Sequence, residues 1–505
     1  MTDLNEPRLR DQPEPGWQIL DRDLNRISRV ELATSYVSQP LVAVGIALIF
    51  VAMAALWGGL IAGGSSGSLV IVVASAFAAY LALNIGANDV ANNMGPAVGA
   101  NALTMSGALI VAAICETAGA LIAGGDVVDT IANGIVSPAS LADDSVFVIA
   151  MMAALLSSAL WLNLATWLGA PVSTTHAIVG GVAGAGIMAA GFGAVDWAGM
   201  SRIALSWIVS PVLGGAMAAG ALWVVHHLII DRDDKIAAAR VWVPVLIGVM
   251  SWAFATYLAL KGLKHLFDVT LGQAVLIRMA CAVLAFVTSR PYIRRCAHGL
   301  ENRNKSLKVL FQLPLVLSAA LMSFAHGAND VSNAIGPLAA IVSTLGHAGD
   351  GGQVTVPLWV MVIGALGISL GLLLFGPRLI RMVGVQITKL NAMRAYCVAL
   401  SAAITVIAAS WLGLPVSSTH IAIGGIFGVG FFREAVEARR MRQMAGDITL
   451  PEMPVEERQR RKLVRRSHFM TIVAAWIITV PATATVSGLL FLLLARLQNV
   501  SIPAG

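Results

Sequence analysis

Residues 86–96 read Gly-Ala-Asn-Asp-Val-Ala-Asn-Asn-Met-Gly-Pro, and residues 327–337 read Gly-Ala-Asn-Asp-Val-Ser-Asn-Ala-Ile-Gly-Pro. A second pair keeps the same order, because Trp-Leu-Gly-Ala-Pro-Val-Ser-Thr-Thr-His at 167–176 returns as Trp-Leu-Gly-Leu-Pro-Val-Ser-Ser-Thr-His at 411–420. The two offsets, 241 and 244 positions, are nearly equal. Two such pairs predict a duplicated architecture in which each half carries one copy of each motif.

The composition places the chain in a membrane. Of the 505 residues, 57% are hydrophobic and 12% are charged, whereas a soluble domain carries roughly 25% charged residues. Apolar stretches of about 20 residues recur from Leu41 onward, each long enough to span the ~30 Å core of a bilayer. The net charge of +6 does not indicate a nucleic-acid partner, because the basic residues lie in loops beside apolar segments. We predict an all-α polytopic membrane protein.

The placement of basic residues predicts the topology. Arg-rich loops at 290–308 and 433–467 are expected in the cytoplasm. No Lys or Arg occurs between Arg29 and Arg202, and the loops of that region carry aspartates instead. This acidic region is expected on the external side.

Two apolar segments are interrupted at matched places. Gly-x-Pro breaks at 169–171 and 413–415 divide them, since Pro stops one helix and suits the first turn of the next. We predict re-entrant helical hairpins near 146–191 and 394–432, entering from opposite sides. The halves then form inverted repeats, as in many secondary transporters.

This reading divides the chain into consecutive parts. They are a cytoplasmic N-terminal tail (1–40), an extra membrane span and loop (41–67), a first repeat (68–228), connecting spans with a basic cytoplasmic loop (229–307), and a second repeat (308–505) that includes the basic loop at 433–467.

Each hairpin break is followed by three hydroxyl side chains. A helix that starts inside a membrane exposes unpaired N–H groups and a partial positive charge, which together attract an anion. Two such starts facing each other would hold a small tetrahedral oxyanion. The simpler alternative is that these hydroxyls only cap buried helix ends. The candidate anion ligands are Ser173, Thr174, Thr175, Ser417, Ser418 and Thr419.

The Asn-Asp motifs supply oxygen ligands for a cation. Carboxylate and amide groups three or four positions apart lie on one face of a helix, and such oxygens suit a monovalent cation or a proton relay. An ionisable residue within a membrane span is a functional candidate because its burial is costly. The candidates are Asn88, Asp89, Asn92 or Asn93, Asn329, Asp330, Asn333 and, in a separate apolar run, Glu116. Structural hydrogen bonding is the alternative role.

Both motifs and both hairpins are poor in basic residues. Without Lys or Arg at the motifs, helix ends contribute only about 0.3–2 kcal/mol each toward holding an anion. That is too little to offset burial of the anion. A co-transported cation, sodium or a proton, would supply the missing charge, so we expect symport and no other cofactor or metal.

Histidines follow both hydroxyl runs, at His176 and His420. We expect them to be structural, with a gating or proton-linked role as the alternative. No nucleophile–base set and no metal-ligand cluster can be assembled around them. The sequence therefore does not indicate an enzyme.

The motifs at 86–96, 171–176, 327–337 and 415–420 resemble the inorganic phosphate transporter (PiT) family. The resemblance covers most of residues 68–495. It implies an inverted-repeat fold, phosphate held by the hairpin Ser/Thr residues, and coupling cations near the Asn-Asp pairs. One departure is that the stretch 364–371, which corresponds to the region of Glu116, contains no acidic residue.

Other functions stay open on the sequence alone. A permease for sulfate or another tetrahedral oxyanion would share this fold, and an anion channel is a more distant alternative because it needs no buried acids. The expected partners are inorganic phosphate, the coupling cation and the lipid bilayer, with a homo-oligomer left open. The expected location is the cell's inner (plasma) membrane.

Overall fold

The fold is known from a computed structural model, which describes residues 41–64, 67–141, 143–170, 172–259, 270–346, 356–386, 391–445 and 466–500. The predicted tail at 1–40 lies outside these residues. The chain divides into two units, Met1–Ile49 and Phe50–Gly505. The structure describes only residues 41–49 of the first unit, the start of a helix that runs from Leu41 to Ala62.

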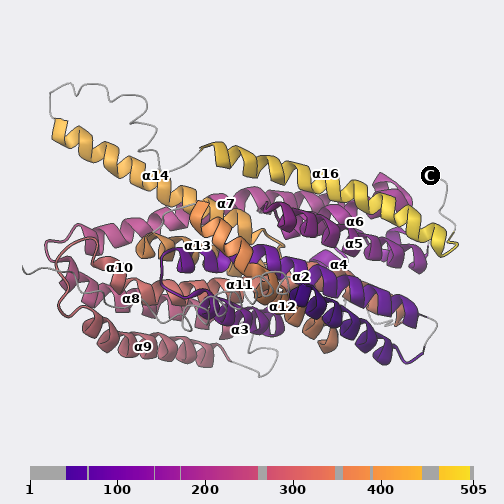
Figure 1. Ribbon diagram of the computed structural model, residues 1–505, viewed down its shortest axis with the longest axis horizontal. Helices are drawn as coiled ribbons and strands as arrows, with labels where there is room; N and C mark the ends of the chain where they lie inside the picture. Colours follow the sequence, from indigo (N-terminus) through magenta and orange to yellow (C-terminus); the bar gives the residue numbers. More distant parts are fainter. Residues whose placement is uncertain are drawn as a thin grey trace, which may run out of the picture. The chain divides into compact units, whose positions relative to one another are not determined.

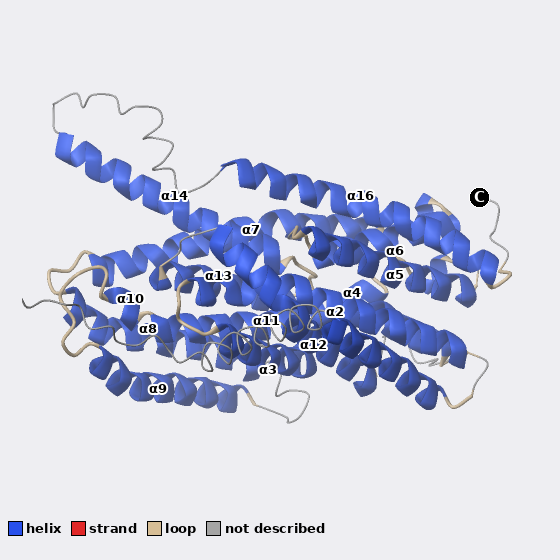
Figure 2. Ribbon diagram, in the orientation of Figure 1, coloured by secondary structure: helices blue, strands red, loops and turns tan. Residues whose placement is uncertain are grey.

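The described residues form helices and no strand, as Figure 2 shows. Eleven of the helices in the described part are long and apolar enough to cross a membrane. The predicted all-α, polytopic class is thereby confirmed.

The first half contains helices α2 to α7, labelled in Figure 1. They are α2 (Ser68–Gly99), α3 (Met105–Ala123), α4 (Gly125–Ala132), α5 (Asp144–Leu168), α6 (Thr174–Ala190) and α7 (Trp197–Val225). Helices α8 (Lys235–Tyr257), α9 (Leu271–Cys296) and α10 (Leu307–Leu310) follow. The second half contains α11 (Gln312–Leu345), α12 (Leu358–Gln386), α13 (Ala392–Trp411), α14 (Ser418–Ala445) and α16 (Arg466–Leu497).

The predicted hairpin breaks separate α5 from α6 and α13 from α14. Gly169 follows α5 at φ +69°, and Gly413 lies at φ +67° after α13. These are left-handed conformations that glycine adopts without a Cβ penalty, which explains why both helices end there. Pro171 lies outside the described residues. Whether either hairpin re-enters the membrane stays a prediction.

One predicted boundary is wrong. The segment from 433 was expected to be a loop, but α14 continues to Ala445. An Arg433–Glu437 pair, with nitrogen and oxygen 3.2 Å apart, joins adjacent turns of this extension. Residues 446–465 of the predicted loop lie outside the described residues, and its last two residues, 466–467, belong to α16.

The two halves exchange equivalent contacts. A Cβ on Gly86 of α2 would overlap the carbonyl oxygen of Ile368 in α12, and a Cβ on Gly327 of α11 would overlap that of Glu116 in α3. Glu116 and Ile368 are therefore equivalent positions, 252 residues apart. Thr117 and Ser369 have the same separation, and their hydroxyl oxygens lie 2.6 Å apart. When two halves are related by an approximate two-fold axis, a residue can contact its own equivalent only close to that axis. Thr117 and Ser369 are equivalent and in contact, so they lie close to the axis that relates the two halves.

Candidate functional site

Both Asn-Asp motifs lie inside helices and are buried. Asp89 is in α2 and Asp330 is in α11, and both side chains are fully buried. Among the described residues neither carboxylate has a lysine or arginine partner, and such burial is costly, so their surroundings must supply donors or cations.

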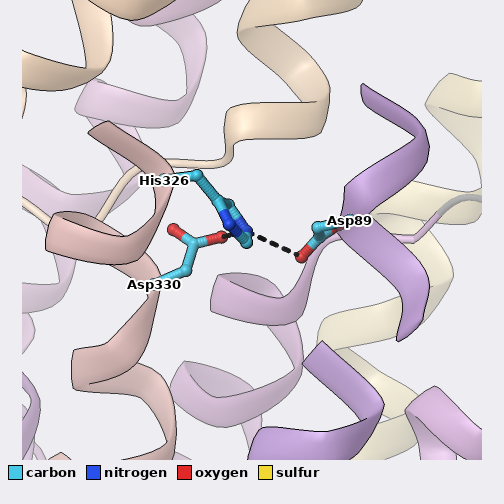
Figure 3. A group of neighbouring side chains, drawn as sticks. All are labelled: Asp89, His326 and Asp330. Atoms are coloured by element: carbon cyan, nitrogen blue, oxygen red, sulfur yellow. Dashed lines mark ion pairs between the residues drawn. The ribbon is translucent and has the colours of Figure 1, made fainter. Parts of the chain in front are cut away.

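His326 lies between the two aspartates, as Figure 3 shows. Its Nε2 is 3.0 Å from Asp330 Oδ2 and 3.6 Å from Asp89 Oδ2. Its Nδ1 is 3.3 Å from Oε1 of Glu116. One fully buried imidazole thus joins three carboxyl groups from three helices, α2, α3 and α11.

Glu116 also binds the first motif directly. Its Oε1 accepts a 2.8 Å hydrogen bond from Nδ2 of Asn93. The acid predicted from the sequence therefore belongs to the same cluster as Asp89. One ligand atom each from Asp89, His326 and Asp330 lies within 4.8 Å of the others, a spacing that could hold a metal ion.

The first serine of each hydroxyl run is a helix cap. The Ser173 hydroxyl accepts from the backbone N–H of His176 at 3.2 Å, and Ser417 accepts from that of His420 at 3.3 Å. For these two serines the structure contains the capping contact that was weighed as the simpler alternative.

The other hydroxyls reach the aspartates. Thr174 and Ser418, at equivalent positions, both lie within hydrogen-bonding distance of Asp330 Oδ2, at 3.3 and 3.4 Å. Thr419 donates to Asp89 Oδ1 at 3.1 Å. The starts of α6 and α14 are therefore built into the carboxylate cluster.

Each Asn-Asp motif also binds the hairpin of the opposite half. Asn92 of α2 donates to the hydroxyl of Thr419 at 2.8 Å, and Asn333 of α11 donates to that of Thr175 at 3.3 Å. The Thr175 hydroxyl donates in turn to the carbonyl of Val416, at 3.0 Å. The predicted anion and cation ligands thus meet in one site.

The first asparagine of each motif anchors a hairpin. Asn88 donates to Thr166 of α5 at 3.2 Å, and Asn329 donates to the equivalent Ser410 of α13 at 2.9 Å. Asn329 Oδ1 also accepts from the Val416 N–H, at 3.3 Å. These bonds hold the second hairpin break against α11.

The two histidines of the hairpins stack. The ring centroids of His176 and His420 are 4.5 Å apart, and Trp207 of α7 covers His176 at 3.7 Å. The Trp207 indole also donates to the carbonyl of Pro415 at 3.2 Å. This packing is consistent with the expected structural role and closes one side of the junction between the hairpins.

Six acceptor atoms at the site are buried and make no hydrogen bond among the described residues. Three are carboxylate oxygens and three are amide oxygens: Asp89 Oδ2, Glu116 Oε2, Asp330 Oδ1, Asn88 Oδ1, Asn93 Oδ1 and Asn333 Oδ1. Buried acceptors are normally satisfied, so this set implies a missing donor or cation.

The sequence reasoning found most of the site but missed His326. A signal was present, because the first motif has Ile85 at the position that His326 occupies before the second motif. An ionisable side chain inside an apolar helix is a functional candidate by the same argument that selected Glu116.

Comparisons with known proteins show the family of the chain. Residues 85–487 match the pattern of the phosphate transporter family. The chain is 41% identical to a Helicobacter pylori protein named "Putative phosphate permease", over 94% of this chain and 99% of that one. It is 35% identical to the chloroplast inorganic phosphate transporter 2-1 of Arabidopsis thaliana, over 81% of this chain and 70% of that one. A solved structure described as the sodium-dependent phosphate transporter superposes with a TM-score of 0.76 at 31% identity, covering 85% of this chain and 99% of that one.

Proposed function

The chain belongs to the phosphate transporter family, and we propose that it is a symporter that imports inorganic phosphate together with a cation. We place it in the cell's inner membrane, where a cation gradient can drive uptake.

The observation that carries the cation proposal is the set of six buried oxygens that make no hydrogen bond among the described residues. Even a doubly protonated imidazole at His326 would leave excess negative charge among three carboxylates. A bound cation offsets that charge. The amide oxygens of Asn88, Asn93 and Asn333 favour sodium over a proton, because an amide oxygen coordinates a metal ion but does not take up a proton at ordinary pH.

We place phosphate between the starts of α6 and α14. The unpaired N–H groups of these two helix starts and the hydroxyls beside them offer donors on two sides of one position. No lysine or arginine lies in either hydroxyl run, so the phosphate charge is offset by the bound cation rather than by a basic side chain.

Shared hydroxyls supply the coupling. Thr174, Ser418 and Thr419 each have one proton to donate, and in the structure it is directed at Asp330 or Asp89. A cation bound to the aspartates would satisfy those carboxylates and free the hydroxyls to donate to phosphate. Each ligand then strengthens binding of the other, as linkage requires.

The test is uptake of radiolabelled phosphate into proteoliposomes that contain the purified full chain. Sodium and proton gradients are imposed separately, with unlabelled sulfate as competitor and Asp330→Asn as the inactive control. We expect accumulation driven by the sodium gradient, insensitive to sulfate and absent in the control variant.

The other outcomes separate the alternatives. Accumulation driven only by a proton gradient would replace sodium by a proton and leave symport intact. Accumulation of labelled sulfate without phosphate would show that the substrate assignment is wrong. Phosphate equilibration without accumulation under either gradient would indicate a channel and refute symport.

A further inference from the structure

Helices α8 and α9 lie side by side (Figure 1). Only 11% of the span in α9 is buried inside the protein, whereas 61% of the spans in α2 and α11 is buried. Helix α9 is thus a peripheral helix whose apolar side chains face lipid.

A shallow apolar groove of about 280 Å³ lies between these two helices. Gly248 permits it, because α8 approaches α9 so closely there that a Cβ would lie 3.2 Å from the Ala282 carbonyl oxygen. The walls are apolar and exposed, with Val249 57% and Val283 55% accessible. Trp252 and Phe286 also line the groove.

An arginine lies over each of these two aromatic rings. The Arg278 guanidinium is 5.5 Å from the centre of the Trp252 ring, and that of Arg290 is 5.9 Å from the centre of the Phe286 ring. The two arginines are 12 positions apart on α9, about 18 Å along a helix. Neither forms an ion pair with a carboxylate in the part of the chain that the structure describes.

We propose that this groove binds an anionic phospholipid of the cytoplasmic leaflet, with its phosphate on Arg290 and one acyl chain along the groove toward Trp252. Three features support this occupant: the groove faces lipid, its walls are apolar, and its ends carry unpaired positive charge. A guanidinium is suited to bidentate binding of phosphate.

Arg290 is the headgroup end because Arg294 and Arg295 follow it within about one and a half turns. Basic residues gather on the cytoplasmic side of membrane helices, where anionic headgroups are recognised. A second copy of this chain, docked here by a two-fold axis, would bring its own arginines against Arg278 and Arg290, so a homodimer contact is disfavoured.

The test uses native mass spectrometry of the delipidated full chain, titrated with phosphatidylglycerol and, separately, with phosphatidylcholine of the same acyl chains. We expect phosphatidylglycerol to bind roughly fivefold more tightly, the contribution of one arginine near a headgroup. Arg290→Gln should abolish that preference. Arg278→Gln is the matched control at the other end of the groove and should retain it.

Val249→Phe provides an independent check because it fills the groove at an exposed position and leaves both arginines in place. It should weaken binding of both lipids. Equal binding of the two lipids to the unmodified chain would overturn the proposal. So would loss of the preference in Arg278→Gln rather than in Arg290→Gln, or unchanged binding of both lipids in Val249→Phe. None of these readouts depends on phosphate uptake, so the lipid site and the proposed transport function can fail separately.

Discussion

Asp89 and Asp330 occupy equivalent positions in the two halves, yet their surroundings differ. Oδ2 of Asp330 has the hydroxyls of Thr174 and Ser418 and the imidazole of His326 within 3.4 Å. Oδ1 of Asp89 accepts from the Thr419 hydroxyl at 3.1 Å and from Nδ2 of Asn92 at 3.4 Å, and its second oxygen lies 3.6 Å from His326.

The difference in the His326 distance comes with a polar trio that is present on only one side of the axis, with Asn93 and Glu116 from the first half and His326 from the second. Glu116 contacts both Asn93 and His326, and the equivalents of Asn93, Glu116 and His326 are Ala334, Ile368 and Ile85, all apolar. The hydrogen bonds between the Asn-Asp motifs and the hairpins occur in both halves. The pair of Glu116 and His326 occurs only once. The duplicated helices and hairpins are therefore arranged symmetrically. The charges of Glu116 and His326, near the axis, have no counterpart at the equivalent positions.

The largest expected effect comes from neutralising Asp330. Asp330→Asn removes the charge that the imidazole and two hydroxyls surround. Loss of one partner in a buried ion pair costs about 3–5 kcal/mol, so phosphate uptake should fall at least roughly a hundredfold. Asp89→Asn should lower uptake less, by roughly tenfold, because the His326 imidazole lies 3.6 Å from Asp89 but 3.0 Å from Asp330. Radiolabelled uptake in proteoliposomes measures both.

Asp143→Asn is the matched control for these two variants, because Asp143 precedes α5 and lies outside the site. Its uptake should equal that of the unmodified chain. Equal losses in Asp330→Asn and Asp89→Asn would contradict the asymmetry.

A second prediction concerns variants in which the polar residues Asn93, Glu116 and His326 are replaced by their apolar equivalents. His326→Ile leaves Glu116 buried without its imidazole, which should destabilise the protein by about 3 kcal/mol. Adding Glu116→Ile and Asn93→Ala copies the apolar trio at the equivalent positions, Ile85, Ile368 and Ala334. The triple variant should regain much of the lost stability, because apolar side chains often replace a buried ion pair without net cost. Uptake should remain impaired.

Thermal unfolding in detergent measures the stability of both variants. A triple variant less stable than His326→Ile alone would show that the trio does not behave as one unit.

The helices and hairpin breaks could be predicted from the sequence better than the distribution of charge in the site. Helices, hairpin breaks and both motifs are local or repeated patterns, so length, glycine and proline positions, and self-similarity are sufficient to predict them. The link from Glu116 to His326 joins α3 to α11, and no local pattern encodes a contact between residues 210 positions apart. The extension of α14 to Ala445 was missed because a run of basic residues was taken to indicate a loop, although its charges can pair along a helix.

A third prediction compares two equivalent hydroxyls. Thr419 donates to a carboxylate, whereas Thr175 donates to the Val416 carbonyl. In the proposed coupling, the cation frees the Thr419 hydroxyl to donate to phosphate, a hydrogen bond to a charged group worth about 1.5–3 kcal/mol, whereas the Thr175 proton stays on a backbone carbonyl. Thr419→Ala should therefore raise the KM for phosphate more than Thr175→Ala does, and Thr419→Ser should restore it. Equal KM values in the two alanine variants would show that Thr419 is not a hydroxyl shared between Asp89 and phosphate.

The smallest expected effect lies on the two-fold axis itself, where Thr117 meets Ser369. Thr117→Val keeps the side-chain shape and removes the hydroxyl. The loss of one neutral hydrogen bond is worth about 1 kcal/mol, so thermal stability should fall slightly. Uptake should change by less than about fivefold, because this pair joins α3 to α12 without touching either aspartate. Thr117→Ser keeps the hydroxyl and serves as the matched control. If Thr117→Val instead reduced uptake as strongly as Asp330→Asn, the axis contact would belong to the transport machinery, and the separation between a symmetric frame and an asymmetric charged site would fail.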